Sequence, residues 1–135
     1  MNQVSLTGRL TKDPEIKHLG NGSAVVNFII AVDKGLSKEK KKEYESKNMP
    51  TADFVKIVAW GNLAENCFKY TNKGSLIGVN GRIQTGSYDD KDGKRVFTTD
   101  VVATTVDFLN LDDSKDRRDY SDMHHGFSPS DIMFE

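Results

Sequence analysis

Apolar and polar side chains alternate at every second position along much of the first 110 residues. The first run places Val4, Leu6, Gly8 and Leu10 on one parity and polar side chains on the other. Successive side chains of an extended strand point to opposite faces of a sheet, so this pattern predicts a half-buried strand. Residues 24–32 are rich in β-branched and aromatic side chains and predict a well-covered strand. The chain is therefore expected to fold around a β-sheet.

Turn residues separate the remaining strand segments. Asp13-Pro14 and the glycines of 20–22 bracket a short segment at 16–19. Residues 35–51 contain four closely spaced lysines and no apolar periodicity, so we expect a long, mobile, basic loop there, with its return strand at 53–61. Segments 76–88 and 95–109, joined through 89–93, predict a second hairpin.

One helix is expected after the return strand. Asn62 is a candidate N-cap, Glu65 follows three residues later, and Gly74 is the expected end. The apolar stripe of this helix includes Cys67, which we expect to be a small core residue. Five strands with one helix between the third and fourth is the order of the OB-fold, an all-β Greek-key barrel that commonly binds oligonucleotides or oligosaccharides.

Length and charge divide the chain into two regions. Its 135 residues fit one domain, which we place at 1–111. Residues 1–110 carry 16 Lys and Arg against 13 Asp and Glu, whereas 111–135 carry 3 against 7, so the total of −1 combines +3 with −4. The tail, residues 112–135, is expected to be disordered, because its stretch 112–130 has almost no aliphatic side chains.

The lone cysteine excludes an intrachain disulfide and a cysteine metal cage. No secretion signal or apolar run of about 20 residues is present, so a cytoplasmic location is expected. The turn at 90–93 looks like a calcium loop, but Tyr88 and Thr99 stand where ligands are required. His124-His125 lies in the tail without a metal-ligand partner. We find no catalytic constellation and expect no enzyme activity, metal or cofactor.

The strand at 53–61 carries the most informative pattern. Phe54, Lys56 and Trp60 share one parity, and apolar side chains occupy the other. A strand covered on both sides is the alternative interpretation. A lysine between two large rings favours a binding groove, because single-strand grooves use rings to stack bases and cations to hold phosphates.

The next strand repeats this division. Ile77, Val79, Gly81 and Ile83 are expected to face inward. Asn80, Arg82, Gln84 and Tyr88 share the opposite parity, so an aromatic side chain again accompanies a cation. Arg9, Lys12, Lys17, Lys34 and the loop lysines extend a possible positive track, although each alone is typical of a solvated surface.

The chain resembles bacterial and phage single-stranded DNA-binding proteins over residues 1 to about 110, in the segments VSLTGRLTKDPEIKHLGNGSAVVNF, IVAWGNLAENCFKYTNKGSLIGVNGRIQT and KRVFTTDVVATTVDFL. The resemblance implies an OB-fold homotetramer that wraps single strands with little sequence preference during replication, recombination and repair. It places base-stacking aromatics at Phe54, Trp60 and Tyr88. The candidate DNA-binding set is Phe54, Trp60, Tyr88, Lys56, Arg82, Arg9, Lys12, Lys17, Lys34, Lys73, Arg95 and Phe97.

Two departures from the family pattern stand out. Leu36 occupies the position of a further stacking aromatic, and the segment SKEKKKEYESKNM makes the basic loop longer than usual. The family closes in an acidic Asp-Ile-Pro-Phe tip that recruits genome-maintenance proteins. This chain ends Asp-Ile-Met-Phe-Glu, so Asp131, Ile132 and Phe134 are the candidate partner-binding residues. An OB-fold docking or assembly subunit with weak nucleic-acid binding remains the alternative function.

Overall fold

The computed structural model describes residues 1–110, and the expected disordered tail and its terminal peptide lie outside these residues. The elements are β1 (Val4–Leu10), β2 (Glu15–His18), β3 (Ala24–Asp33), α1 (Lys38–Ser46), β4 (Ala52–Trp60), α2 (Gly61–Tyr70), β5 (Leu76–Asp89) and β6 (Arg95–Asn110). The described chain is thus mostly β, as expected. It has six strands and two helices where the sequence predicted five strands and one helix.

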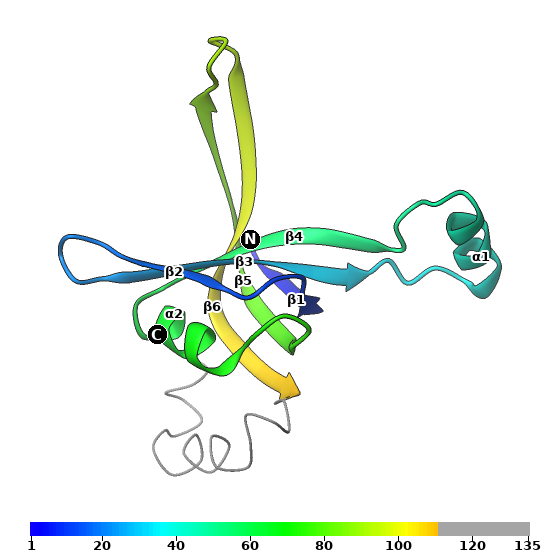
Figure 1. The fold of residues 1–135 in the computed structure, drawn as a ribbon, viewed down its shortest axis with the longest axis horizontal. Helices are drawn as coiled ribbons and strands as arrows, with labels where there is room; N and C mark the ends of the chain where they lie inside the picture. Colours follow the sequence, from blue (N-terminus) through cyan, green and yellow to red (C-terminus); the bar gives the residue numbers. More distant parts are fainter. Residues whose placement is uncertain (111–135) are drawn as a thin grey trace.

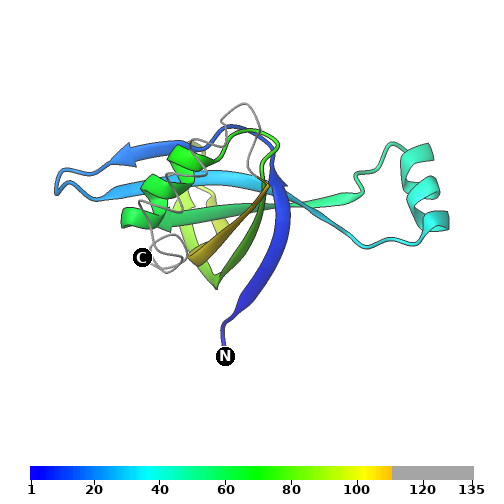
Figure 2. The same ribbon diagram turned by 90° about the horizontal axis from the view of Figure 1, so that it is seen from below.

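All the strands belong to one sheet with the order β1-β5-β6-β4-β3-β2. The pairs are antiparallel except β4 with β6. Arg9 and Leu10 of β1 also pair with Ala31 and Ile30 of β3, so the sheet closes on itself into a barrel (Figures 1 and 2). The strand missing from the expected count is β2, which pairs along its four residues with β3.

The barrel interior is filled by the inward parity of each strand together with one side of α2. Its largest fully buried side chains are Val26, Ile30, Ile57, Leu63, Ile77, Val79 and Val106, and Cys67 is fully buried beside them as expected. Removing this apolar surface from water supplies the main driving force for folding. The inward parity of β1 and of the strand at 53–61 is therefore confirmed.

Helix α2 begins one residue earlier than the sequence predicted. The N-cap position is Trp60, which makes no side-chain capping bond, so the prediction of Asn62 as the cap is wrong. Gly61 has a φ of 66°, a left-handed conformation that lets the chain turn directly from β4 into the helix. The helix ends at Tyr70, and Gly74 lies in the following loop.

The segment predicted as a mobile basic loop contains a helix instead. The Ser37 hydroxyl accepts a hydrogen bond from the Lys40 backbone N–H at the start of α1. Lys47 and Glu43 form an ion pair of 2.9 Å in the last turn, and Asn48 follows with a φ of 56°. These are the capping and charge-pair features that stabilise helices without an apolar face. Helix α1 lies at the tip of the arm formed by β3 and β4 (Figure 1).

The β5–β6 hairpin is a second projection from the barrel (Figure 1). Its register shifts where Asn80 pairs with Thr105 and Gly81 with Ala103, which leaves one extra residue on β6. Beyond this bulge, from Arg82 onward, the side chains of β5 are exposed on both parities. Ile83, expected to face inward, is 44% exposed, because the hairpin has left the barrel at that point.

Candidate nucleic-acid interface

The outer parity of β3 and β4 forms a surface that we call the open face. On these two strands it comprises Asn27, Ile29, Ala31, Phe54, Lys56, Val58 and Trp60. Phe54 and Trp60 are 61% and 44% exposed, and Lys56 between them is exposed too. The alternative in which this parity is core is therefore wrong, and the sequence prediction of an exposed aromatic and cationic parity is confirmed.

The open face continues across the sheet to Arg82. Val58 of β4 is in register with Val102 of β6, and Val102 is in register with Arg82 of β5. Directly paired residues project on the same side of a sheet, so the exposed Arg82 lies on the same surface as Lys56 and the two rings. Four of the predicted residues are thus brought together.

The projecting hairpin presents different residues on its two sides. Tyr88, which is 57% exposed, pairs with Val96 and shares the parity of Arg82. Phe97, which is 77% exposed, pairs with Ser87 on the opposite parity. Arg95 lies on that second side too, with its Nε 3.9 Å from Oδ1 of Asp89. The structure therefore extends the open face to Tyr88 and separates Phe97 and Arg95 from it.

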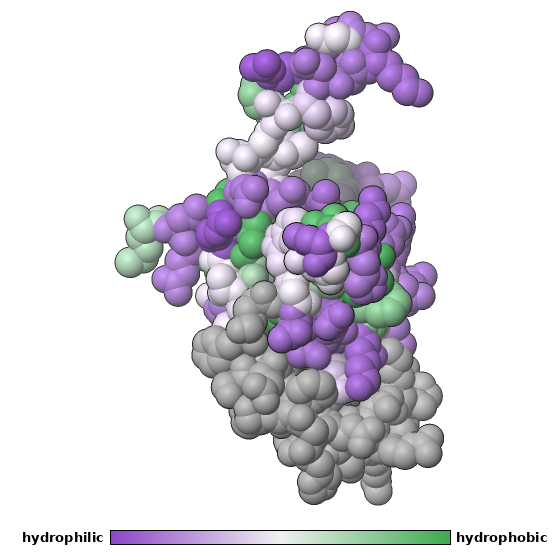
Figure 3. Space-filling model, turned by 90° about the vertical axis from the view of Figure 1, so that its left-hand side faces the viewer, coloured by the Kyte–Doolittle hydropathy of each residue, from purple (hydrophilic) through white to green (hydrophobic). Residues whose placement is uncertain are grey.

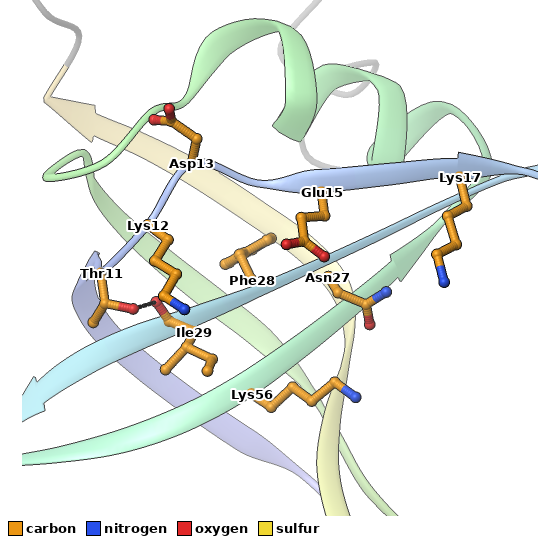
Figure 4. A pocket seen from close by; sticks show the side chains of 9 residues that line it. All are labelled: Thr11, Lys12, Asp13, Glu15, Lys17, Asn27, Phe28, Ile29 and Lys56. Carbon is orange, nitrogen blue, oxygen red and sulfur yellow. Dashed lines mark hydrogen bonds between the residues drawn. The ribbon is translucent and has the colours of Figure 1, made fainter.

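A groove of about 260 Å³ adjoins Lys56. Its lining residues are Thr11, Lys12, Asp13, Glu15, Lys17, Asn27, Phe28, Ile29 and Lys56. The lysines enter from three separate segments, and their ammonium groups surround the hollow (Figure 4). We call this feature the lysine groove. None of its lysines forms an ion pair within the described residues, so their charge is available to an anionic ligand.

The family model for the single-strand binding protein family matches residues 1–109. The chain belongs to this family. It is 52% identical over 110 residues to the single-stranded DNA-binding protein of Clostridium tetani, a match that covers 81% of this chain and 70% of the relative. Single-stranded DNA-binding protein 2 of Clostridium acetobutylicum is also 52% identical over 110 residues, covering 81% and 77%. The corresponding protein of Halalkalibacterium halodurans is 48% identical over 109 residues, covering 81% and 61%.

The single-strand binding family match includes every candidate DNA-binding residue and excludes the candidate partner-binding residues of the tail. Side chains that sequence reasoning missed are Glu15, Asn27 and Ile29. Glu15 pairs with Asn27, and Ile29 pairs with Lys56. The turn at 20–22 could have indicated them, since a hairpin around it places the strand after Pro14 beside β3.

Three predicted cations lie away from the open face. The Lys34 ammonium is 2.5 Å from Oδ1 of Asp53, and this hydrogen bond raises the pKa of Lys34 above its usual value. Arg9 donates a hydrogen bond from Nη1 to the carbonyl oxygen of Gly74 at 2.9 Å. Lys73 follows α2, and its backbone N–H donates to Oδ1 of Asp13 at 2.7 Å. Lys34 therefore has a carboxylate partner already, whereas the Lys73 side chain is exposed at the rim of the lysine groove.

Hydrophilic side chains dominate the side of the molecule seen in Figure 3, with hydrophobic atoms showing only in small areas between them. Within residues 1–110 no three His, Cys, Asp or Glu side chains come together to hold a metal ion. Neither helix in that part of the chain is long and apolar enough to cross a membrane.

Proposed function

We propose that this protein binds single-stranded DNA along the open face, on an OB-fold barrel. The observation that carries the proposal is the exposure of Phe54 and Trp60 on one surface with Lys56 and Arg82. Unpaired aromatic rings at a sheet surface cost free energy in water unless a ligand covers them, and bases stack on such rings irrespective of their identity. Relatives about 50% identical carry the name single-stranded DNA-binding protein, which supports the same ligand.

In this account Phe54, Trp60 and Tyr88 stack bases, and Lys56 and Arg82 hold phosphates. The six residues that separate Phe54 from Trp60 extend over roughly 20 Å of strand, enough for several nucleotides. Stacking and phosphate contacts do not read the Watson–Crick edges of bases, so binding is largely independent of sequence. Lys12 and Lys17 continue the cationic track into the lysine groove.

Further parts of the proposal concern assembly and partners. Residues 1–111 form the DNA-binding domain of a homotetramer, and 112–135 form a tail that docks genome-maintenance proteins through Asp131, Ile132 and Phe134. The role is protection of single strands in replication, recombination and repair, with no catalytic step. Native mass measurement of the intact protein tests the tetramer, and a tail peptide competing for bound partners tests the docking.

The test of the proposed function is a titration of fluorescently labelled oligonucleotides followed by anisotropy. Single strands of unrelated sequence are expected to bind with similar affinity, and a duplex of equal length is expected to bind far more weakly, because its bases are already stacked. Binding that weakens with salt supports the phosphate contacts. Absence of single-strand binding at low salt would overturn the proposal and favour the docking or assembly subunit.

A further inference from the structure

The lysine groove contains a pair of polar side chains that phosphate binding does not explain. Glu15 of β2 is directly opposite Asn27 of β3, so the two side chains project together from the same face. Figure 4 shows both pointing into the hollow, between the side chains of Lys12 and Lys17. A carboxylate at this point opposes the binding of phosphate, which indicates a different partner for it.

Glu15 is the carboxylate of the groove that remains available. The other one, on Asp13, accepts the Lys73 backbone N–H at 2.7 Å and points away from the hollow (Figure 4). Within the described residues Glu15 forms no ion pair or side-chain hydrogen bond, and neither does Asn27, which is half-buried. Both side chains therefore have unused hydrogen-bonding capacity inside a partly enclosed site.

These two groups match the edge of a base that carries an amino group. A carboxylate accepts hydrogen bonds only, whereas an amide both donates and accepts. Cytosine offers an amino group to Glu15 and a ring nitrogen or carbonyl acceptor to Asn27, and adenine and guanine also carry exocyclic amino donors. Thymine presents carbonyl oxygens on both sides of its single ring N–H, so they face the carboxylate unfavourably. Single-stranded bases leave these edges free for recognition.

We propose that the lysine groove is a subsite for one base with an exocyclic amino group, recognised by Glu15 and Asn27 while Lys12, Lys17 and Lys56 hold the adjoining phosphates. Its volume of about 260 Å³ is below the roughly 300–1,000 Å³ of pockets for drug-sized ligands, which suits one nucleotide unit. The subsite rests on the proposed single-strand function. It adds a local base preference to a surface that otherwise binds by stacking.

The experiment compares the intact protein with Glu15→Gln, using equal-length strands of thymidine and of 5-methyl-deoxycytidine. These two bases share the 5-methyl group and differ in the edge that Glu15 would contact. Glutamine keeps the shape of the side chain but donates as well as accepts, so it can bind thymine. We expect the preference for 5-methyl-deoxycytidine over thymidine to fall by about fivefold in the variant, the lower end of what one base-edge contact contributes.

Asp13→Asn is the matched control, because it removes one negative charge at the same groove and keeps an oxygen for the Lys73 N–H. Both variants are expected to bind every strand more tightly through reduced repulsion, and Asp13→Asn is expected to leave the base preference unchanged. An equal preference in wild type and Glu15→Gln would overturn the subsite while leaving single-strand binding intact. Failure of all three proteins to bind either strand would instead reject the proposed function.

Discussion

Lys56 and Lys34 provide a matched test of which cations contact DNA. Lys56 lies on the open face between Phe54 and Trp60 and has no ion-pair partner among the described residues. Lys34 is on the same arm, but its ammonium group is 2.5 Å from the carboxylate of Asp53. Lys56→Gln is therefore expected to reduce the salt dependence of single-strand binding, and Lys34→Gln to leave it nearly unchanged.

The magnitude follows from counterion release. Each phosphate neutralised on a single strand contributes about 0.7 to the slope of log affinity against log salt. If Lys56 neutralises one phosphate per protomer contacted, its loss lowers that slope by about 0.7. Between about 50 and 200 mM salt, the variant then loses about 2.6-fold less affinity than wild type for each contact.

The assay is an anisotropy titration of one labelled oligonucleotide at four or more salt concentrations, with thermal unfolding of each variant as a control for folding. Both lysines belong to the β3–β4 arm, outside the buried core, so neither substitution is expected to lower the unfolding midpoint appreciably. Equal reductions of the slope by the two variants would refute the assignment based on the ion pair. An unchanged slope for Lys56→Gln would show that this ammonium does not contact phosphate.

Three further outcomes are expected. Trp60→Ala should weaken single-strand binding by about 1–3 kcal/mol, measured by anisotropy, with little change in the unfolding midpoint because the ring is 44% exposed; unfolding would contradict its position on the open face. Tyr88→Ala should reduce affinity more than Phe97→Ala, since only Tyr88 shares a parity with Arg82; equal losses would indicate DNA on both sides of the hairpin. Truncation after Leu111 removes 3 cations and 7 acidic side chains and should tighten binding at low salt, an effect that should shrink near 0.15 M salt, where the screening length is about 8 Å. A salt-independent effect would contradict simple charge competition.

The strand parities could be predicted because the period of two directly reports which side of a sheet each side chain takes. This argument located Phe54, Lys56 and Trp60 on an exposed face before any coordinates were known, and the structure confirms their exposure. It failed at Ile83, because alternation does not show where a hairpin leaves the barrel and exposes both of its sides. The same limit explains why Phe97 could not be assigned to a side different from that of Tyr88.

Helix α1 was missed because it has no buried residue, and the prediction relied on apolar periodicity. Its sequence signals are the Ser37 cap, the Glu43–Lys47 pair and Asn48 in the left-handed region, which depend on charge and capping alone. The lysine groove depends on the pairing of β2 with β3 and of β3 with β4. Such long-range register is set by the whole barrel, so no local pattern indicated that Lys12, Lys17 and Lys56 converge.

The central claim is that DNA binds on the open face, and Trp60 fluorescence tests it most directly. The chain contains a single tryptophan, so its emission reports from one known position on that face. Titration with an unstructured oligonucleotide is expected to quench this emission strongly and to saturate at the stoichiometry found by anisotropy, because bases stack on the indole ring. Binding by anisotropy without any change in Trp60 emission would show that the DNA lies elsewhere and would contradict the account.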